Sequence, residues 1–142
     1  MKDEHPIPDT LTRTLTDSGV RATPQREVIL QVLLEERNHP TAEELFNRVK
    51  TRLPSISLAT VYNCLETLEH CGLVKPVNFE RESTRYCPNR REHAHFLDAA
   101  TGKVRDVDVP ASLLQQLRDA IPAGCTVDQI EINFRGSSAT KA

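Results

Sequence analysis

The sequence lacks both a long apolar run and a Cys-x-x-Cys motif. Its first residues include Asp3, Glu4, Pro6 and Pro8, so it predicts neither a signal peptide nor a membrane-spanning helix. We therefore expect a cytoplasmic protein with no membrane partner. The chain contains 4 cysteines, and in a reducing compartment they are not expected to form a disulfide framework.

An excess of positive charge is also lacking. The formal net charge is −2; residues 1–91 hold 13 Lys or Arg against 13 Asp or Glu, and residues 92–142 hold 5 against 7. A surface that binds duplex DNA must therefore be local. The best local candidate is 81–91, where arginines outnumber Glu82, although a solvated charge run is the usual explanation of such a stretch.

The stretch from Cys87 to Asp106 carries the clearest chemical signal. On an extended strand His93 and His95 share one face, and Asp106 follows a predicted turn at 98–102, which suits a neighbouring strand. A thiol, two imidazoles and a carboxylate are ligands for a borderline divalent cation. The alternative is that His93 and His95 lie on a solvent-exposed strand face and that Cys87 is a small buried apolar residue. Spacing alone does not decide between the two.

The first half of the chain predicts four helices, each with a start signal. The starts are Asp9, Thr23 followed by Pro24, a capping box of Thr41 and Glu44, and Ser57; the stops are Gly19, the segment 38–40, Pro54 and Gly72.

The fourth of these helices is predicted to be amphipathic. Its outer face carries Thr60, Asn63, Thr67 and His70, which can bond to bases or phosphates. Two strands at 73–79 and 84–87 would follow as a hairpin. Packed helices followed by a hairpin indicate a winged helix-turn-helix domain. The alternative is a helical module whose fourth helix merely faces water.

The remainder predicts a small αβ unit. We expect strands at 93–97, 103–109 and 127–134, and a helix at 111–121 with its leucines and Ile121 facing inward. Such a unit has an exposed sheet edge and little core, and a second copy would cover both. The expected fold is α+β, with a winged-helix domain at 1–89 and an αβ dimerisation domain at 90–142.

Several segments together resemble the ferric uptake regulator family of bacterial metal-dependent repressors. They are RATPQR at 21–26, HPTAEEL at 39–45, SLATVYN at 57–63, GLV at 72–74, and HAH at 93–95 followed by GKV at 102–104. The resemblance covers residues 10–135 in consistent order. It implies a homodimer that binds a palindromic operator in double-stranded DNA, with one regulatory divalent metal per subunit between the two domains.

The resemblance also assigns residues. The implied metal ligands are His39, Cys87, His93, His95 and Asp106. The implied DNA contacts are Arg21 in the minor groove and Ser57, Thr60, Tyr62 and Asn63 in the major groove. Without the family, Tyr62 is more simply explained as part of the packing of its own helix.

Two positions depart from the family pattern. Many relatives hold a structural zinc with two Cys-x-x-Cys pairs, but here Asp98 and Thr101 occupy the first pair, so no structural zinc held by four cysteines is expected. Cys87 stands where the peroxide- and iron-sensing branches usually carry an acidic residue. Zinc-sensing relatives often carry cysteine there.

The signal is predicted from the ligand types. Asp106, rather than glutamate, is the pattern of the peroxide-sensing branch, in which bound Fe²⁺ reacts with peroxide and the oxidant attacks a histidine ligand, here His39 or His93. Cys87 would itself be sensitive to oxidation, and its thiolate favours Zn²⁺. We favour peroxide or iron sensing through Fe²⁺ or Mn²⁺, with a zinc-responsive repressor as the alternative.

Two other classes compete with a repressor. Two histidines and a carboxylate also describe a small non-haem metalloenzyme, but the upstream helices predict a DNA-binding domain, so an enzyme is not expected. The third possibility is a metal-stabilised interaction module, which should unfold when the metal is removed.

Overall fold

The computed structural model describes residues 9–138, and residues 1–8, on which part of the signal-peptide prediction rests, lie outside them. Within the described range, every helix is too short or too polar to cross a bilayer. The chain divides into two compact units, Met1–Arg90 and Arg91–Ala142.

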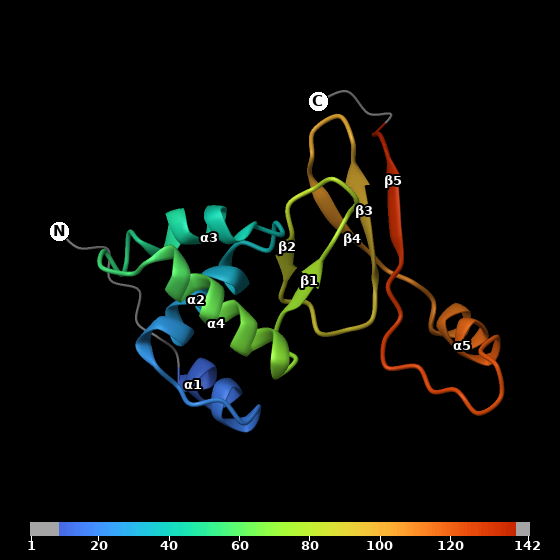
Figure 1. Cartoon of the computed structure of the whole chain (residues 1–142), viewed down its shortest axis with the longest axis horizontal. Helices are drawn as coiled ribbons and strands as arrows, with labels where there is room; N and C mark the ends of the chain where they lie inside the picture. Colours follow the sequence, from blue (N-terminus) through green and yellow to red (C-terminus); the bar gives the residue numbers. More distant parts are fainter. Residues whose placement is uncertain (1–8, 139–142) are drawn as a thin grey trace. The chain divides into compact units, whose positions relative to one another are not determined.

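The described residues of the first unit form four helices and a two-stranded sheet (Figure 1). The helices are α1 (Asp9–Asp17), α2 (Pro24–Glu35), α3 (Ala42–Val49) and α4 (Leu58–His70), and the antiparallel strands are β1 (Lys75–Val77) and β2 (Arg85–Cys87). Helix α2 contacts α1, α3 and α4. This arrangement of helices followed by a hairpin is the predicted winged-helix architecture.

The predicted caps hold three of the four helix starts. The side chains of Thr23 and Ser57 accept hydrogen bonds from backbone amides three residues on, and Thr41 and Glu44 form a reciprocal capping box. Helix α2 ends at Glu35, earlier than predicted, because Glu36 already has an extended backbone. Both strands of the hairpin are shorter than predicted.

The core of the first unit lies among the helices. Leu15, Ile29, Leu33, Leu45, Val61, Leu65 and Leu68 are all at most 1% exposed. Burying one such side chain contributes about 1.5–3 kcal/mol, so this cluster stabilises the packing of α2, α3 and α4 against one another.

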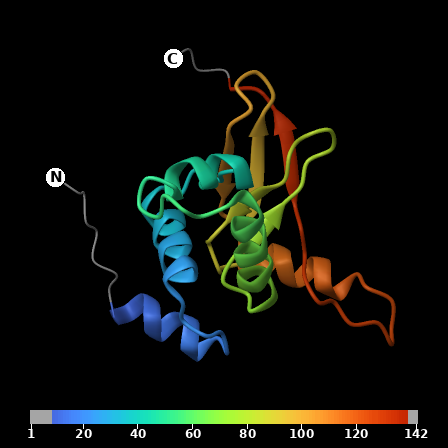
Figure 2. The same ribbon diagram turned by 60° about the vertical axis from the view of Figure 1, so that its left-hand side comes forward.

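The second unit, as far as residue 138, forms a three-stranded sheet and one helix (Figures 1 and 2). Its elements are β3 (Ala94–Asp98), β4 (Val104–Val107), α5 (Ala111–Asp119) and β5 (Asn133–Gly136). The central strand, β3, pairs antiparallel with β4 and parallel with β5. The connection to β5 through α5 is the crossover that parallel pairing needs.

Two predictions for this unit are wrong. The last strand begins at Asn133 instead of 127, because its ladder to β3 starts at the pair His95 and Asn133. In α5 only Leu114 is buried. Leu113, Leu117 and Ile121 are 42%, 39% and 40% exposed in the single chain, since one small sheet cannot cover the whole apolar face of the helix.

Candidate metal centre and nucleic-acid interface

Three donor atoms converge near the start of β3 and the end of β4. The Nε2 atoms of His93 and His95 lie 3.0 Å apart. Oδ1 of Asp106 lies 3.1 Å from Nε2 of His93 and 3.3 Å from Nε2 of His95. Both histidines are buried at 8% exposure. Two imidazoles and one carboxylate therefore face a common point.

The strand geometry explains this convergence. His95 lies directly opposite Asp106 in the antiparallel ladder, and His93, two residues before it, projects to the same side. The Nδ1 atom of His93 lies 2.5 Å from the carbonyl oxygen of Arg91, which fixes the ring with Nε2 toward Asp106. The sequence-based predictions of a shared face and a neighbouring strand are confirmed.

This donor set fits a divalent cation. Ligands about 2.1 Å from a metal stand about 3.0 Å apart in octahedral and about 3.4 Å apart in tetrahedral geometry. The separations of 3.0, 3.1 and 3.3 Å lie between these values. The nitrogen and oxygen donors are also those that Fe²⁺, Mn²⁺ and Zn²⁺ accept.

The first unit brings together the other two predicted ligands. A ring nitrogen of His39 and Sγ of Cys87 lie within 4.8 Å of one another, and the residues are 4% and 1% exposed. His39 has φ of 55°, in the left-handed region, which costs a non-glycine residue about 1–3 kcal/mol and occurs mainly at functional sites. The structure thus groups His39 with Cys87, and His93 with His95 and Asp106.

Arg85 was not identified from the sequence as a functional residue, although its side chain bonds to the His39 backbone. Nη1 of Arg85 donates to the carbonyl oxygen of His39 at 3.0 Å. Arg85 appeared only as one member of a basic run. Its position two residues before Cys87, on the same face of a strand, is the signal that could have identified it.

Asp98 and Thr101, in the positions of the absent cysteine pair, close the turn between β3 and β4. Oδ1 of Asp98 accepts from the amide of Ala100 at 2.9 Å, and Oγ1 of Thr101 accepts from the amide of Lys103 at 3.3 Å. Hydrogen bonds accepted by these two side chains therefore stabilise the turn.

Helix α4 presents predicted DNA contacts to solvent. Tyr62 is 44% exposed and Asn63 is exposed, so neither side chain belongs to the buried core. The Tyr62 phenol donates to Oε1 of Glu43 at 3.4 Å. Partial burial and the Glu43 carboxylate raise the pKa of Tyr62 above its usual value, so it stays a neutral donor.

The remaining predicted contacts lie near helix starts. Ser57 and Thr60 share a hydrogen bond of 2.9 Å between their hydroxyls, and Ser57 also accepts from the Thr60 amide. The exposed Arg21 lies before α2, where its carbonyl accepts from Nη1 of Arg26 at 2.9 Å. Local capping places Ser57 and Thr60, and the side chains of all three residues are accessible or partly accessible.

The chain is similar to known regulators along most of its length. The model of the ferric uptake regulator family matches residues 17–135. A curated relative, the peroxide-responsive repressor PerR of Staphylococcus aureus strain USA300, is 36% identical over 107 residues, which are 75% of this chain and 72% of that protein. Among solved structures, the Campylobacter jejuni peroxide stress regulator is 27% identical with a TM-score of 0.71, covering 97% of this chain and all of that one. The Vibrio cholerae ferric uptake regulator is 26% identical with a TM-score of 0.71, covering 89% and 98%.

Proposed function

This chain belongs to the ferric uptake regulator family, and on that premise we propose that it is a repressor that leaves its DNA when peroxide oxidises a regulatory metal site. The family assignment makes it a metal-dependent, DNA-binding transcriptional repressor. It also makes the metalloenzyme interpretation wrong, because the relatives are regulators. A repressor acts where the DNA is, so the proposed location is the cytoplasm.

The proposed regulatory site uses one divalent metal per subunit. Its ligands are His39, Cys87, His93, His95 and Asp106. The observation that carries the proposal is the convergence of His93, His95 and Asp106 with separations of 3.0–3.3 Å. A metal that also binds His39 and Cys87 favours one arrangement of the two units, as a ligand does when it binds one conformation more tightly.

Fe²⁺ or Mn²⁺ is the proposed occupant. A site of five donors that includes a carboxylate suits these ions. The bound metal would supply the redox chemistry that activates peroxide beside an imidazole. In the net reaction one oxygen atom of H₂O₂ adds to the ring of His39 or His93, which loses two electrons, and the other oxygen leaves as water. The modified ring is a poorer ligand, so metal affinity falls and DNA is released.

The proposed assembly is a homodimer on a palindromic operator. Residues 1–89 would bind DNA through Arg21, Ser57, Thr60, Tyr62 and Asn63, and residues 90–142 would pair the subunits. Support for pairing comes from the apolar side chains that α5 and β5 expose, with Phe134 at 48% as the most exposed. A two-fold dimer matches a two-fold DNA site.

The experiment has two parts. A gel shift with the chain's own promoter, with and without Fe²⁺, Mn²⁺ or Zn²⁺, should show binding only when metal is present. Metal-independent binding, or none, contradicts the repressor mechanism. Intact mass after peroxide treatment of the Fe²⁺-loaded protein should then show a gain of one oxygen on His39 or His93. An unreactive site that retains zinc rejects peroxide sensing.

A zinc-responsive repressor is the second candidate. The observation that favours it is Cys87, 1% exposed and beside His39, because thiolate is a soft ligand preferred by Zn²⁺. Metal analysis of the protein purified from its host should find mainly zinc if this candidate is correct.

A further inference from the structure

The His39 loop has a backbone conformation that its neighbours must maintain. His39 has φ of 55° and precedes Pro40, which normally pushes a residue toward extended conformations. Its carbonyl accepts from Nη1 of Arg85 at 3.0 Å, and the next carbonyl, of Pro40, accepts from the Tyr86 amide at 3.0 Å. Strand β2 thus donates hydrogen bonds to two successive carbonyl groups of the loop.

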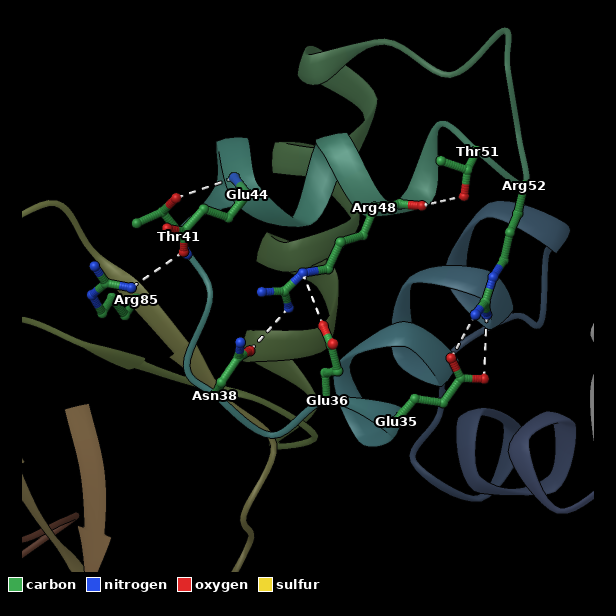
Figure 3. Close-up of polar contacts among 9 residues, drawn as sticks. All are labelled: Glu35, Glu36, Asn38, Thr41, Glu44, Arg48, Thr51, Arg52 and Arg85. Atoms are coloured by element: carbon green, nitrogen blue, oxygen red, sulfur yellow. Dashed lines mark hydrogen bonds and ion pairs between the residues drawn. The ribbon is translucent and has the colours of Figure 1, made fainter. Parts of the chain in front are cut away.

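The same guanidinium nitrogen reaches a second element. Nη1 of Arg85 lies 3.2 Å from Oε1 of Glu44, the carboxylate atom that also accepts from the Thr41 amide at 3.0 Å (Figure 3). Glu44 belongs to the first turn of α3. Arg85 therefore bonds simultaneously to the backbone of the His39 loop and to the capping box of α3.

We propose that Arg85 is a positioning residue, which uses Glu44 as its anchor to hold His39 in the orientation that binds metal. This inference rests on the proposed role of His39 as a ligand. Arg85 and Cys87 lie two residues apart on β2 and project to the same side, so one strand supplies both a ligand and the support for its partner ligand. Partners that orient a ligand in this way typically change metal affinity about 10–100-fold when removed.

The anchor also connects the His39 loop to the DNA-reading helix. Glu43, next to Glu44 in the first turn of α3, accepts from the phenol of Tyr62 on α4. If the His39 loop moves when metal leaves, it would move Glu44 and this turn with it. Because Arg85 acts by positioning a metal ligand, its removal should raise the metal concentration that gives half-maximal DNA binding. The DNA affinity at saturating metal should not change.

The first unit offers a matched control. Arg52 makes a two-pronged ion pair with Glu35, at 2.5 and 3.3 Å (Figure 3). Its side chain is 20% exposed, against 21% for Arg85. Arg52 follows α3, and within the described residues its hydrogen bonds and ion pair go to Glu35 and to the Val49 carbonyl, not to the His39 loop. Removing it therefore deletes an equivalent surface ion pair without touching the proposed ligand.

The test measures Mn²⁺ affinity by chelator competition and DNA binding to the chain's own promoter across a Mn²⁺ titration. Arg85→Ala should weaken Mn²⁺ binding about 10–100-fold and raise the half-maximal Mn²⁺ concentration in proportion. Arg52→Ala should leave both unchanged. Arg85→Lys, which keeps one charged donor, should recover part of the loss. If Arg85→Ala does not fold, Glu44→Gln provides the same test, because it removes the charge that holds Arg85.

His39→Ala separates the two levels of inference. If the proposal holds, this variant loses Mn²⁺ affinity, and adding Arg85→Ala to it weakens binding no further. Equal Mn²⁺ affinity in His39→Ala and wild type overturns the proposed ligand role itself, and the positioning role with it. Loss in His39→Ala together with wild-type behaviour of Arg85→Ala overturns only the positioning role, as does an additive loss in the double variant.

Discussion

His95 and Asp106 face each other across the ladder between β3 and β4, with Nε2 of the histidine 3.3 Å from Oδ1 of the aspartate. In a short antiparallel pair, directly opposite residues keep their side chains in contact for as long as the register holds. The turn that joins these strands is closed by Asp98 and Thr101, so the register, and with it three of the five proposed ligands, depends on local hydrogen bonds.

Asp106→Asn should abolish metal-dependent DNA binding, because it removes the only carboxylate of the proposed ligand set. The loss of Mn²⁺ affinity should exceed the roughly 10–100-fold expected for a residue that only supports a ligand. Asp108→Asn is the control, since Asp108 makes an exposed ion pair with Arg91, with side chains 86% and 77% exposed. Equal metal affinities for the two variants would remove Asp106 from the site.

Cys87→Asp should shift the metal preference from Zn²⁺ toward Fe²⁺ and Mn²⁺, because a carboxylate replaces the soft thiolate. The measurement is the ratio of Zn²⁺ to Mn²⁺ affinities in wild type and variant. Cys71→Ala is a control for the general effect of removing a thiol. An unchanged ratio in Cys87→Asp would show that the thiol does not determine selectivity.

Leu117→Glu should weaken the proposed dimer. Leu117 lies 39% exposed on α5, and a carboxylate buried in an apolar interface loses its hydration without gaining a partner. Sedimentation velocity should show a larger monomer fraction than wild type at the same concentration. Gln116→Glu, an exposed neighbour on the same helix, should leave the distribution unchanged, and identical behaviour of the two variants would exclude this face of α5 from the interface.

Tyr86→Phe should reduce the loss of stability at alkaline pH. Burial, followed by the charge of Glu69, raises the pKa of Tyr86 above its usual value. The folded protein therefore holds this proton more tightly than the unfolded chain, whose tyrosine titrates near pH 10. The stabilising contribution is complete below about pH 10 and is lost as pH rises through the folded pKa.

Denaturant unfolding at pH 8 and at about pH 10.5 provides the measurement for Tyr86→Phe. The wild type should lose more stability between these values than the variant, because lysine titration is common to both and cancels in the difference. Parallel losses would show that Tyr86 titrates alike in the folded and unfolded states.

Thiol labelling of the native protein should modify Cys125 before Cys64. Cys125 is exposed and Cys64 is buried at 7% exposure. Burial raises the pKa of the Cys64 thiol, opposed only in part by Arg26, and the thiolate is the reactive form. A time course with iodoacetamide followed by peptide mass analysis gives the order. Rapid labelling of Cys64 would mean that the helical core opens readily.

The amino-acid sequence determined features that depend on residues two or three positions apart. The caps at Thr23, Thr41 and Ser57 form as predicted, because capping bonds join a side chain to an amide three residues away. The shared face of His93 and His95 follows from the two-residue period of a strand.

Only the tertiary structure decided which distant groups meet. Arg85 bonds to the carbonyl of His39, 46 positions earlier, because the helical core turns the loop before α3 against β2. The start of β5 at Asn133 and the exposed side of α5 depend likewise on which partners β3 and the small sheet provide. Periodicity indicates which side of an element is apolar, whereas packing decides whether anything in the same chain covers it.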